Sequence, residues 1–188
     1  DEVLNANSGD RVDSIQNAVG NAESGDTLRV GDGTYNENVV IENSLATSDD
    51  LSGLTIEATD GATPEVVFKP SSATGIPDDV TALEAENAGD IAKVEVYAEG
   101  VTVSGINVTR TAADDRSADS EFNTQGVTVR NSNVTIEDVS IDSNLGAETG
   151  NSNSGIFVSN EGSPTETVDI SNVNIDGFET GVLVSDFY

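Results

Sequence analysis

The nine residues VTVSGINVT at positions 101–109 decide the fold, because the chain repeats their pattern twice more. They align without gaps with VTIEDVSID at 134–142 and with VDISNVNID at 168–176. A second motif interleaves with the first, as GVTVRN (126–131), GIFVSN (155–160) and GVLVSD (181–186). The repeat length is close to thirty residues, and one such unit cannot bury its apolar face alone. The self-similarity therefore predicts a stack of repeats that share one core.

Aligning the repeats produces columns that are aliphatic in every copy and alternate with polar columns. An alternation of period two predicts short strands with one face inside and the other in water. The aliphatic columns are Val101/Val134/Val168, Val103/Ile136/Ile170, Ile106/Val139/Val173, Val108/Ile141/Ile175, Val127/Ile156/Val182 and Val129/Val158/Val184. A repeat then holds about three strands, each pairing in parallel with its counterpart in the next repeat.

Two kinds of corner separate these strands. A two-residue corner is expected at Ser104-Gly105, Glu137-Asp138 and Ser171-Asn172. At Gly126, Gly155 and Gly181 the missing Cβ is expected to permit another turn. The pattern predicts an all-β fold, a right-handed parallel β-helix. The main alternative is an antiparallel sandwich, which gives no reason for a gapless register across repeats.

One helix is predicted, at 13–23, with Asp13 or Ser14 as its N-cap. Its apolar stripe predicts a cap over the open end of the first coil, and consists of Ile15, Ala18, Val19 and Ala22. The other end has no comparable cap, since 181–188 stops within a core strand. The chain is then either a fragment of a longer solenoid or meets a partner through its last coil.

The chain reads as a single domain, 1–188, with coils over 27–188. The early strands are expected at 27–30, 38–41, 54–58 and 65–69. Three polar or Pro-containing stretches interrupt the rhythm and are interpreted as surface loops, at 70–89, 111–125 and 143–154. Long loops on a rigid scaffold are where binding usually resides.

The composition is strongly acidic, with 35 Asp and Glu against 7 Lys and Arg and a formal net charge of −28. Molar salt screens such self-repulsion, so the charge indicates adaptation to high salt and a haloarchaeal source. Scattered basic residues exclude a nucleic-acid interface, and no apolar run reaches the length of a membrane span. The chain has no Cys. The sequons at Asn107 and Asn133 favour an exported, glycosylated protein at the cell surface.

The opening of the chain resembles that of pectin-lyase-like β-helix proteins. The residues that carry the resemblance lie in SIQNAV (14–19), SGDTL (24–28) and GTYNENV (33–39). This superfamily includes pectin methylesterases and NosD-like, carbohydrate-associated repeat proteins of archaeal surfaces. The resemblance implies the β-helix fold but no activity, because the scaffold carries enzymes and adhesins alike. Gly33-x-Tyr35-x-Glu37 matches the first motif of the methylesterases, whereas the later catalytic motifs of the family's esterases and hydrolases are absent.

Candidate site residues fall into four groups. A possible Ca²⁺ site is formed by carboxylates in one loop, Asp114, Asp115, Asp119 and Glu121. Asp142 and Asp176 fall one coil apart, about 4.8 Å by strand spacing, close to the separation that retaining glycosidases use. Candidate ligand or interface residues are Phe157, Leu183, Phe187 and Tyr188. Structural roles are expected for the Gly33–Glu37 turn, with Glu37 near the cap helix, and for the Asn131/Asn160/Asp186 stack.

These observations favour a non-enzymatic surface module, adhesive or filament-forming, with no cofactor beyond possible Ca²⁺. Self-association through the last coil, or contact with more of its own chain, is the expected partnership. The alternatives are a polysaccharide-active domain, a lyase or glycosidase, and a carbohydrate-binding module in which Phe157 stacks on sugar.

Overall fold

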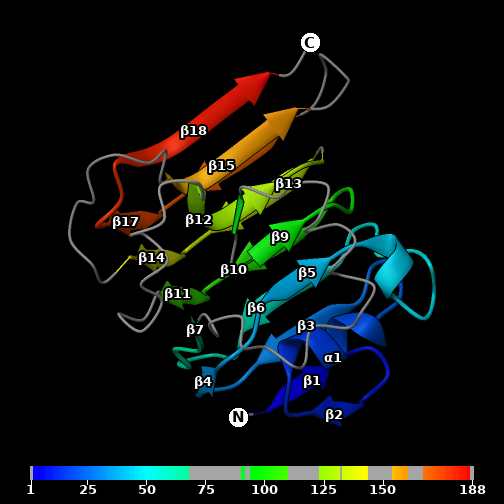
Figure 1. Cartoon of the computed structure of the whole chain (residues 1–188). Coiled ribbons are helices and arrows are strands. Elements are labelled where there is room, and N and C mark those ends of the chain that lie inside the picture. The colour runs from blue at the N-terminus through cyan, green and yellow to red at the C-terminus, as the bar shows by residue number, and fades with distance from the viewer. Residues whose placement is uncertain are drawn as a thin grey trace.

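The computed structural model describes residues 2–67, 90–91, 94–109, 123–131, 133–143, 154–160 and 167–186. Their strands lie in three sheets, and in each sheet the strands follow one another from the N-terminal to the C-terminal end of the molecule (Figure 1). The predicted carboxylate cluster at Asp114, Asp115, Asp119 and Glu121, and the aromatic pair Phe187 and Tyr188, lie outside the described residues.

Sheet A contains, in spatial order, β16 (Val168–Ser171), β13 (Val134–Glu137), β10 (Thr102–Ser104), β6 (Thr55–Ala58), β3 (Thr27–Val30), β1 (Val3–Asn5) and β2 (Arg11–Val12). Sheet B contains β17 (Asn174–Asp176), β14 (Ser140–Asp142), β11 (Asn107–Thr109), β7 (Glu65–Val67) and β4 (Thr34–Tyr35). Sheet C contains β18 (Thr180–Asp186), β15 (Ser154–Asn160), β12 (Asn123–Val129), β9 (Val94–Val96) and β5 (Val39–Ile41), and β8 (Asp90–Ile91) pairs with β12 outside this order.

From β3 onward the chain visits sheets A, B and C in turn, and we call each A–B–C passage a circuit. Every strand pair between successive circuits is parallel, and the predicted columns pair in register. Ile136, for example, pairs with Val103 on one side and Ile170 on the other. The all-β prediction and the gapless columns are therefore confirmed, because hydrogen bonding in register and burial of alternate side chains demand the same alignment.

The N-terminal end departs from this pattern. β1 pairs antiparallel with both β3 and β2, so sheet A is not parallel throughout, and this hairpin precedes the helix. The sequence pattern predicts no strand at either segment of this hairpin. A two-residue strand carries too few side chains to show a period, which explains why β2 was missed.

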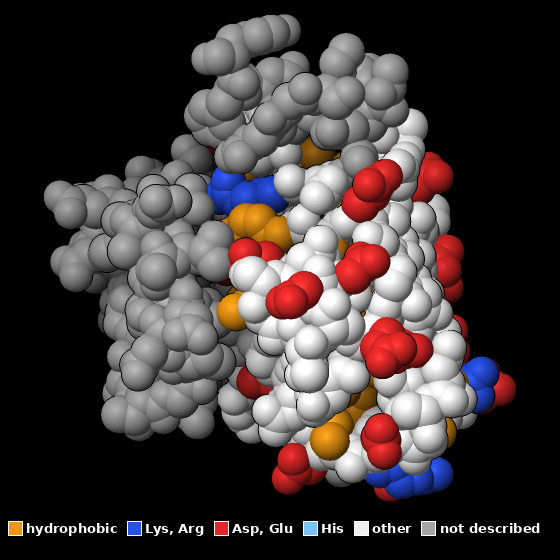
Figure 2. Space-filling view, turned by 90° about the vertical axis from the view of Figure 1, so that its right-hand side faces the viewer, with side chains coloured by type: hydrophobic (Ala, Val, Ile, Leu, Met, Phe, Trp, Pro, Cys, Tyr) orange, Lys and Arg blue, Asp and Glu red, His pale blue; other side chains and the backbone are white. Residues whose placement is uncertain are grey.

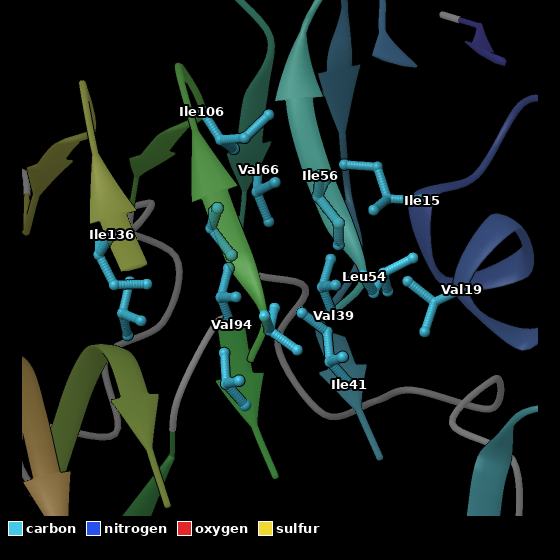
Figure 3. Close-up of a cluster of buried hydrophobic side chains, with 14 of the residues drawn as sticks. Ile15, Val19, Val39, Ile41, Leu54, Ile56, Val66, Val94, Ile106 and Ile136 are labelled. Atoms are coloured by element: carbon cyan, nitrogen blue, oxygen red, sulfur yellow. The ribbon is translucent and has the colours of Figure 1, made fainter. Parts of the chain in front are cut away.

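The cap helix α1 (Ile15–Gly20) is shorter than the predicted 13–23. Ser14 is its N-cap, and Asn21 ends it at the C-cap. Ile15 and Val19 are buried, and Figure 3 shows them pointing from α1 towards Leu54 and Ile56. The predicted apolar stripe is therefore correct, while the flanking residues belong to the connections.

Other boundaries shift by a few residues. β5 and β6 each begin one residue later than predicted, at Val39 and Thr55. Two predicted loops lose residues to strands, since β12 begins at Asn123 and β15 at Ser154. These strand starts are polar, so the hydrophobic pattern did not mark them. The stretch 70–89 lies outside the described residues.

The core fills the space between the sheets and contains the inward columns of the first four circuits, part of which Figure 3 shows. Ile136, Ile141 and Ile156 each have a relative exposure of 0%. In the last circuit the equivalent Val182 and Val184 are 42% and 64% exposed. No later circuit among the described strands covers them.

The two-residue corner between sheets A and B is confirmed. Its second residue has a positive φ in three successive circuits, 70° at Gly105, 54° at Asp138 and 49° at Asn172. Glycine and the short polar residues Asp and Asn tolerate this conformation best. The Asn172 amide also donates a hydrogen bond to the Asp138 carboxylate one circuit away, which links the two corners.

The glycine column Gly126/Gly155/Gly181 has a different cause from the predicted one. None of the three appears among the described residues with positive φ. A Cβ at Gly126 would instead meet Ile141 Cγ2 of sheet B and lie 2.7 Å from the Gly155 carbonyl oxygen. Close packing between circuits, rather than turn geometry, therefore requires glycine there.

Candidate functional site

The most unusual arrangement of side chains lies on the outward face of sheet C. The Arg130 guanidinium carbon lies 6.0 Å from the centre of the Tyr97 ring and 5.9 Å from that of Phe157. The Tyr97 hydroxyl donates a 2.7 Å hydrogen bond to Glu95. A cation between two aromatic faces, next to a carboxylate, is a stabilising arrangement that can also present charge to a ligand. Figure 2 shows a basic group beside hydrophobic and acidic side chains on a face rich in Asp and Glu.

This face is more buried than an outward face in water would be. Strand pairing places Val40, Glu95, Thr128, Phe157 and Leu183 in one column of sheet C. Within it Thr128 is 1% exposed and Phe157 6%, whereas Leu183 in the last circuit is half-buried. Gln125 is also buried and accepts a hydrogen bond from Thr128. Phe157 is therefore a packed residue, with little ring surface left for stacking on a sugar.

Tyr97 provides a pH test of this cluster. Burial, and then the neighbouring Glu95 carboxylate, raise the pKa of Tyr97 well above its usual value of 10.0, and burial also raises the pKa of Tyr35. The folded state thus favours the neutral phenol of Tyr97. The contribution of this phenol to the free energy of unfolding is complete below pH 10 and is lost as the pH rises above 10. We expect the free energy of unfolding in urea to fall above pH 10, and to fall less steeply in Tyr97→Phe. An equal slope in both proteins would contradict the assignment to Tyr97.

Asp142 and Asp176 occupy equivalent positions in β14 and β17, as predicted, and pair across the two circuits. Asp142 is half-buried and Asp176 is exposed. Within the described part of the chain no group of three or more Asp, Glu, His or Cys residues is placed to hold a metal ion. The pair could contribute acid–base chemistry only beside a substrate-binding cleft. A cavity does occur among the described residues, but it lies at the opposite end of the molecule.

That cavity has a volume of about 480 Å³ and lies beside α1 at the N-terminal end. Its walls come from the β1–β2 hairpin, α1 and Thr47 and Ser48, and the apolar part of the lining is Val3, Val12, Ala18 and Ala22. Sequence reasoning missed it, because the hairpin that forms one wall gave no periodic signal. Several of its polar lining residues are bonded within the protein, as in the hydrogen bonds that Thr47 and Ser48 donate to the Gly20 and Ala22 carbonyls.

The Gly33–Glu37 turn has the structural role that the sequence predicted. Tyr35 is buried, and its hydroxyl receives a hydrogen bond from the Glu2 amide at 3.1 Å. Glu37 accepts hydrogen bonds from the Ile15 and Gln16 amides at 2.8 and 3.0 Å, and from the Ser14 hydroxyl at 2.7 Å. It caps the first turn of α1 from a position 22 residues away from Ile15.

The predicted glycosylation residues differ in setting. Asn107 lies within β11, flanked by β7 and β14. Asn133 is exposed at a corner with φ of 57°, where its amide nitrogen donates to Glu99 at 3.0 Å and its amide oxygen accepts from Thr167 at 3.2 Å. In the Asn131/Asn160/Asp186 stack, the Asn131 amide donates to the Tyr97 carbonyl at 2.6 Å, a bond from side chain to backbone as expected.

Comparison with known proteins found no match to a protein-family model, to a curated protein or to a solved structure. No helix among the described residues is long and apolar enough to cross a membrane. The site must therefore be interpreted from its own chemistry.

Proposed function

We propose that this chain is a right-handed parallel β-helix of the pectin-lyase-like type that serves as a non-enzymatic structural module of an exported surface protein in a halophilic archaeon. In this role it presents loops from a rigid scaffold and contacts further β-coils through its last circuit. Asn107 and Asn133 are its glycosylation candidates.

The observation that carries the proposal is the contrast between successive circuits. Val127 and Ile156 are at most 1% exposed, whereas Val182, next in the same column, is 42% exposed. An apolar surface that continues a packed column marks an interaction site. The ordered passage through three sheets and the parallel register support the β-helix. The net charge of −28 supports function in molar salt.

A carbohydrate-binding module, or a polysaccharide lyase or glycosidase, is the second candidate. The grouping of Tyr97, Arg130 and Phe157 favours it, because aromatic and cationic groups both contact acidic sugars. The burial of Phe157 counts against it. Retardation of the wild-type protein, but not of Phe157→Ala, in gels containing acidic polysaccharide would favour this candidate.

The test of the structural role is electron microscopy of the native protein in molar salt, with its intact mass measured on the same sample. We expect particles that associate end to end at their last circuits, and a mass that includes glycan. Dispersed particles that depolymerise polysaccharide would contradict the proposal. The same preparation, transferred to low salt, is expected to lose its association.

A further inference from the structure

We infer that the side chain of Gln16 takes the place of a neighbouring strand at the outer edge of β5, and that it keeps this edge from pairing with another extended segment. The inference concerns the β5 edge of sheet C alone, and it goes beyond the proposed structural role of the chain. In the sequence, Gln16 is only a polar position beside the apolar stripe of the cap helix.

The backbone of β5 has one side facing β9 and one side facing outward, because β5 is the end strand of sheet C among the described residues. Ile41 faces β9, since its carbonyl oxygen accepts hydrogen bonds from the Tyr97 and Ala98 amides at 2.9 and 3.1 Å. The main-chain groups of successive strand residues point to opposite sides. Val40 therefore directs both its N–H and its C=O away from β9, and these are the groups that a further strand would bind.

The Gln16 carboxamide binds both of these groups. Its oxygen accepts a 2.7 Å hydrogen bond from the Val40 amide, and its nitrogen donates one of 3.2 Å to the Val40 carbonyl. A carboxamide carries an acceptor and a donor side by side, so it can match the N–H and C=O of one strand residue. Val40 is buried, and an unmet hydrogen bond there would be costly. Gln16 thus supplies the hydrogen bonds of an adjoining strand residue.

This contact is held from both sides. The Gln16 backbone amide donates a 3.0 Å hydrogen bond to the carboxylate of Glu37, which shortly precedes β5 in the chain. Helix and strand therefore hold each other at two points, because Glu37 binds the Gln16 backbone and Gln16 binds the Val40 backbone. The Glu42 carbonyl, just beyond β5, accepts a 3.0 Å hydrogen bond from the Leu45 amide. An incoming strand would have to displace these internal partners.

Three substitutions separate this role from that of an ordinary helix residue. Gln16→Ala removes both side-chain hydrogen bonds but keeps a good helix former and the backbone bond to Glu37. Gln16→Glu keeps an oxygen that can accept from the Val40 amide and loses the donor to its carbonyl. Asn17→Ala is the matched control. It removes a carboxamide from the next, exposed position, and the two hydrogen bonds that Asn17 makes through its backbone remain.

The experiment is hydrogen exchange at single amides, combined with sedimentation equilibrium in molar KCl. At low protein concentration we expect the Val40 amide of Gln16→Ala to exchange at least tenfold faster than in the wild type, with the Ile41 amide unchanged. At higher concentration the mean mass of this variant should rise above that of the wild type, because an open edge pairs with extended segments. The protection of Val40 should return with the mass, which would locate the new contact at β5. In Gln16→Glu the Val40 amide should stay protected, and Asn17→Ala should match the wild type.

Faster exchange throughout α1 and β5 in Gln16→Ala would show that Gln16 only fastens the helix, and would overturn the inference. A Val40 amide that stays protected in this variant, or a mean mass no higher than that of Asn17→Ala, would overturn it as well. Urea unfolding checks that each variant is folded. If Gln16→Ala does not fold, Gln16→Met provides the same test, because it keeps the length of the side chain and lacks both hydrogen-bonding groups.

Discussion

Gly126→Ala is expected to lower the free energy of unfolding by about 3 kcal/mol, the upper end of the usual cost of overpacking. The new Cβ would meet Ile141 Cγ2 and lie 2.7 Å from the backbone oxygen of Gly155. A side chain could rotate away, but the backbone oxygen belongs to β15, which pairs with β12 from Gln125↔Ser154 to Val129↔Val158. Relief therefore requires two circuits to separate. Urea unfolding in molar KCl, followed by circular dichroism, measures the effect.

Gly181→Ala is the control, because Gly181 occupies the same column in the last circuit and a Cβ there would meet no atom within 4 Å. We expect its stability to remain within about 0.5 kcal/mol of the wild type. Equal losses in the two variants would show that the column needs glycine for its backbone conformation, and would contradict the explanation by packing between circuits.

Glu37→Ala is expected to cost about 2 to 3 kcal/mol, since the carboxylate accepts two amide hydrogen bonds and one hydroxyl hydrogen bond at the start of α1. Removing it leaves the Ile15 and Gln16 amides without that partner. The loss should extend beyond α1, because Gln16 and Ile15 also hold the helix against sheet C and the core. The measurement is again urea unfolding, with hydrogen exchange to locate the opening.

Asp13→Ala separates charge from hydrogen bonding. Asp13 is exposed beside the same helix start, so its removal changes the charge near the helix dipole equally. We expect a loss of a few tenths of a kcal/mol at most, because exposed charges there contribute little in molar salt. If Asp13→Ala and Glu37→Ala were equally destabilising, long-range charge rather than the capping hydrogen bonds would explain the role of Glu37.

The sequence alone determined the strands that repeat and the side chains that face inward. Columns such as Val103/Ile136/Ile170 follow from aliphatic residues at a fixed spacing, and burial selects the same register that hydrogen bonding requires. The helix stripe at Ile15 and Val19 and the structural role of Glu37 were also predicted correctly. The acidic composition predicts a salt-adapted protein, and this stays a prediction.

The tertiary structure decided what depends on neighbours in space. The β1–β2 hairpin, the Gln16 contact with Val40, and the burial of Phe157 beside Arg130 all join residues that no local period connects. The glycine column shows the same limit, since Gly126 and Gly181 look alike in sequence, and only the presence or absence of a stacked circuit distinguishes them. A periodic sequence specifies the repeating unit, because each unit meets the same forces. What covers its ends and faces depends on contacts that occur once, and these become visible only when the chain is folded.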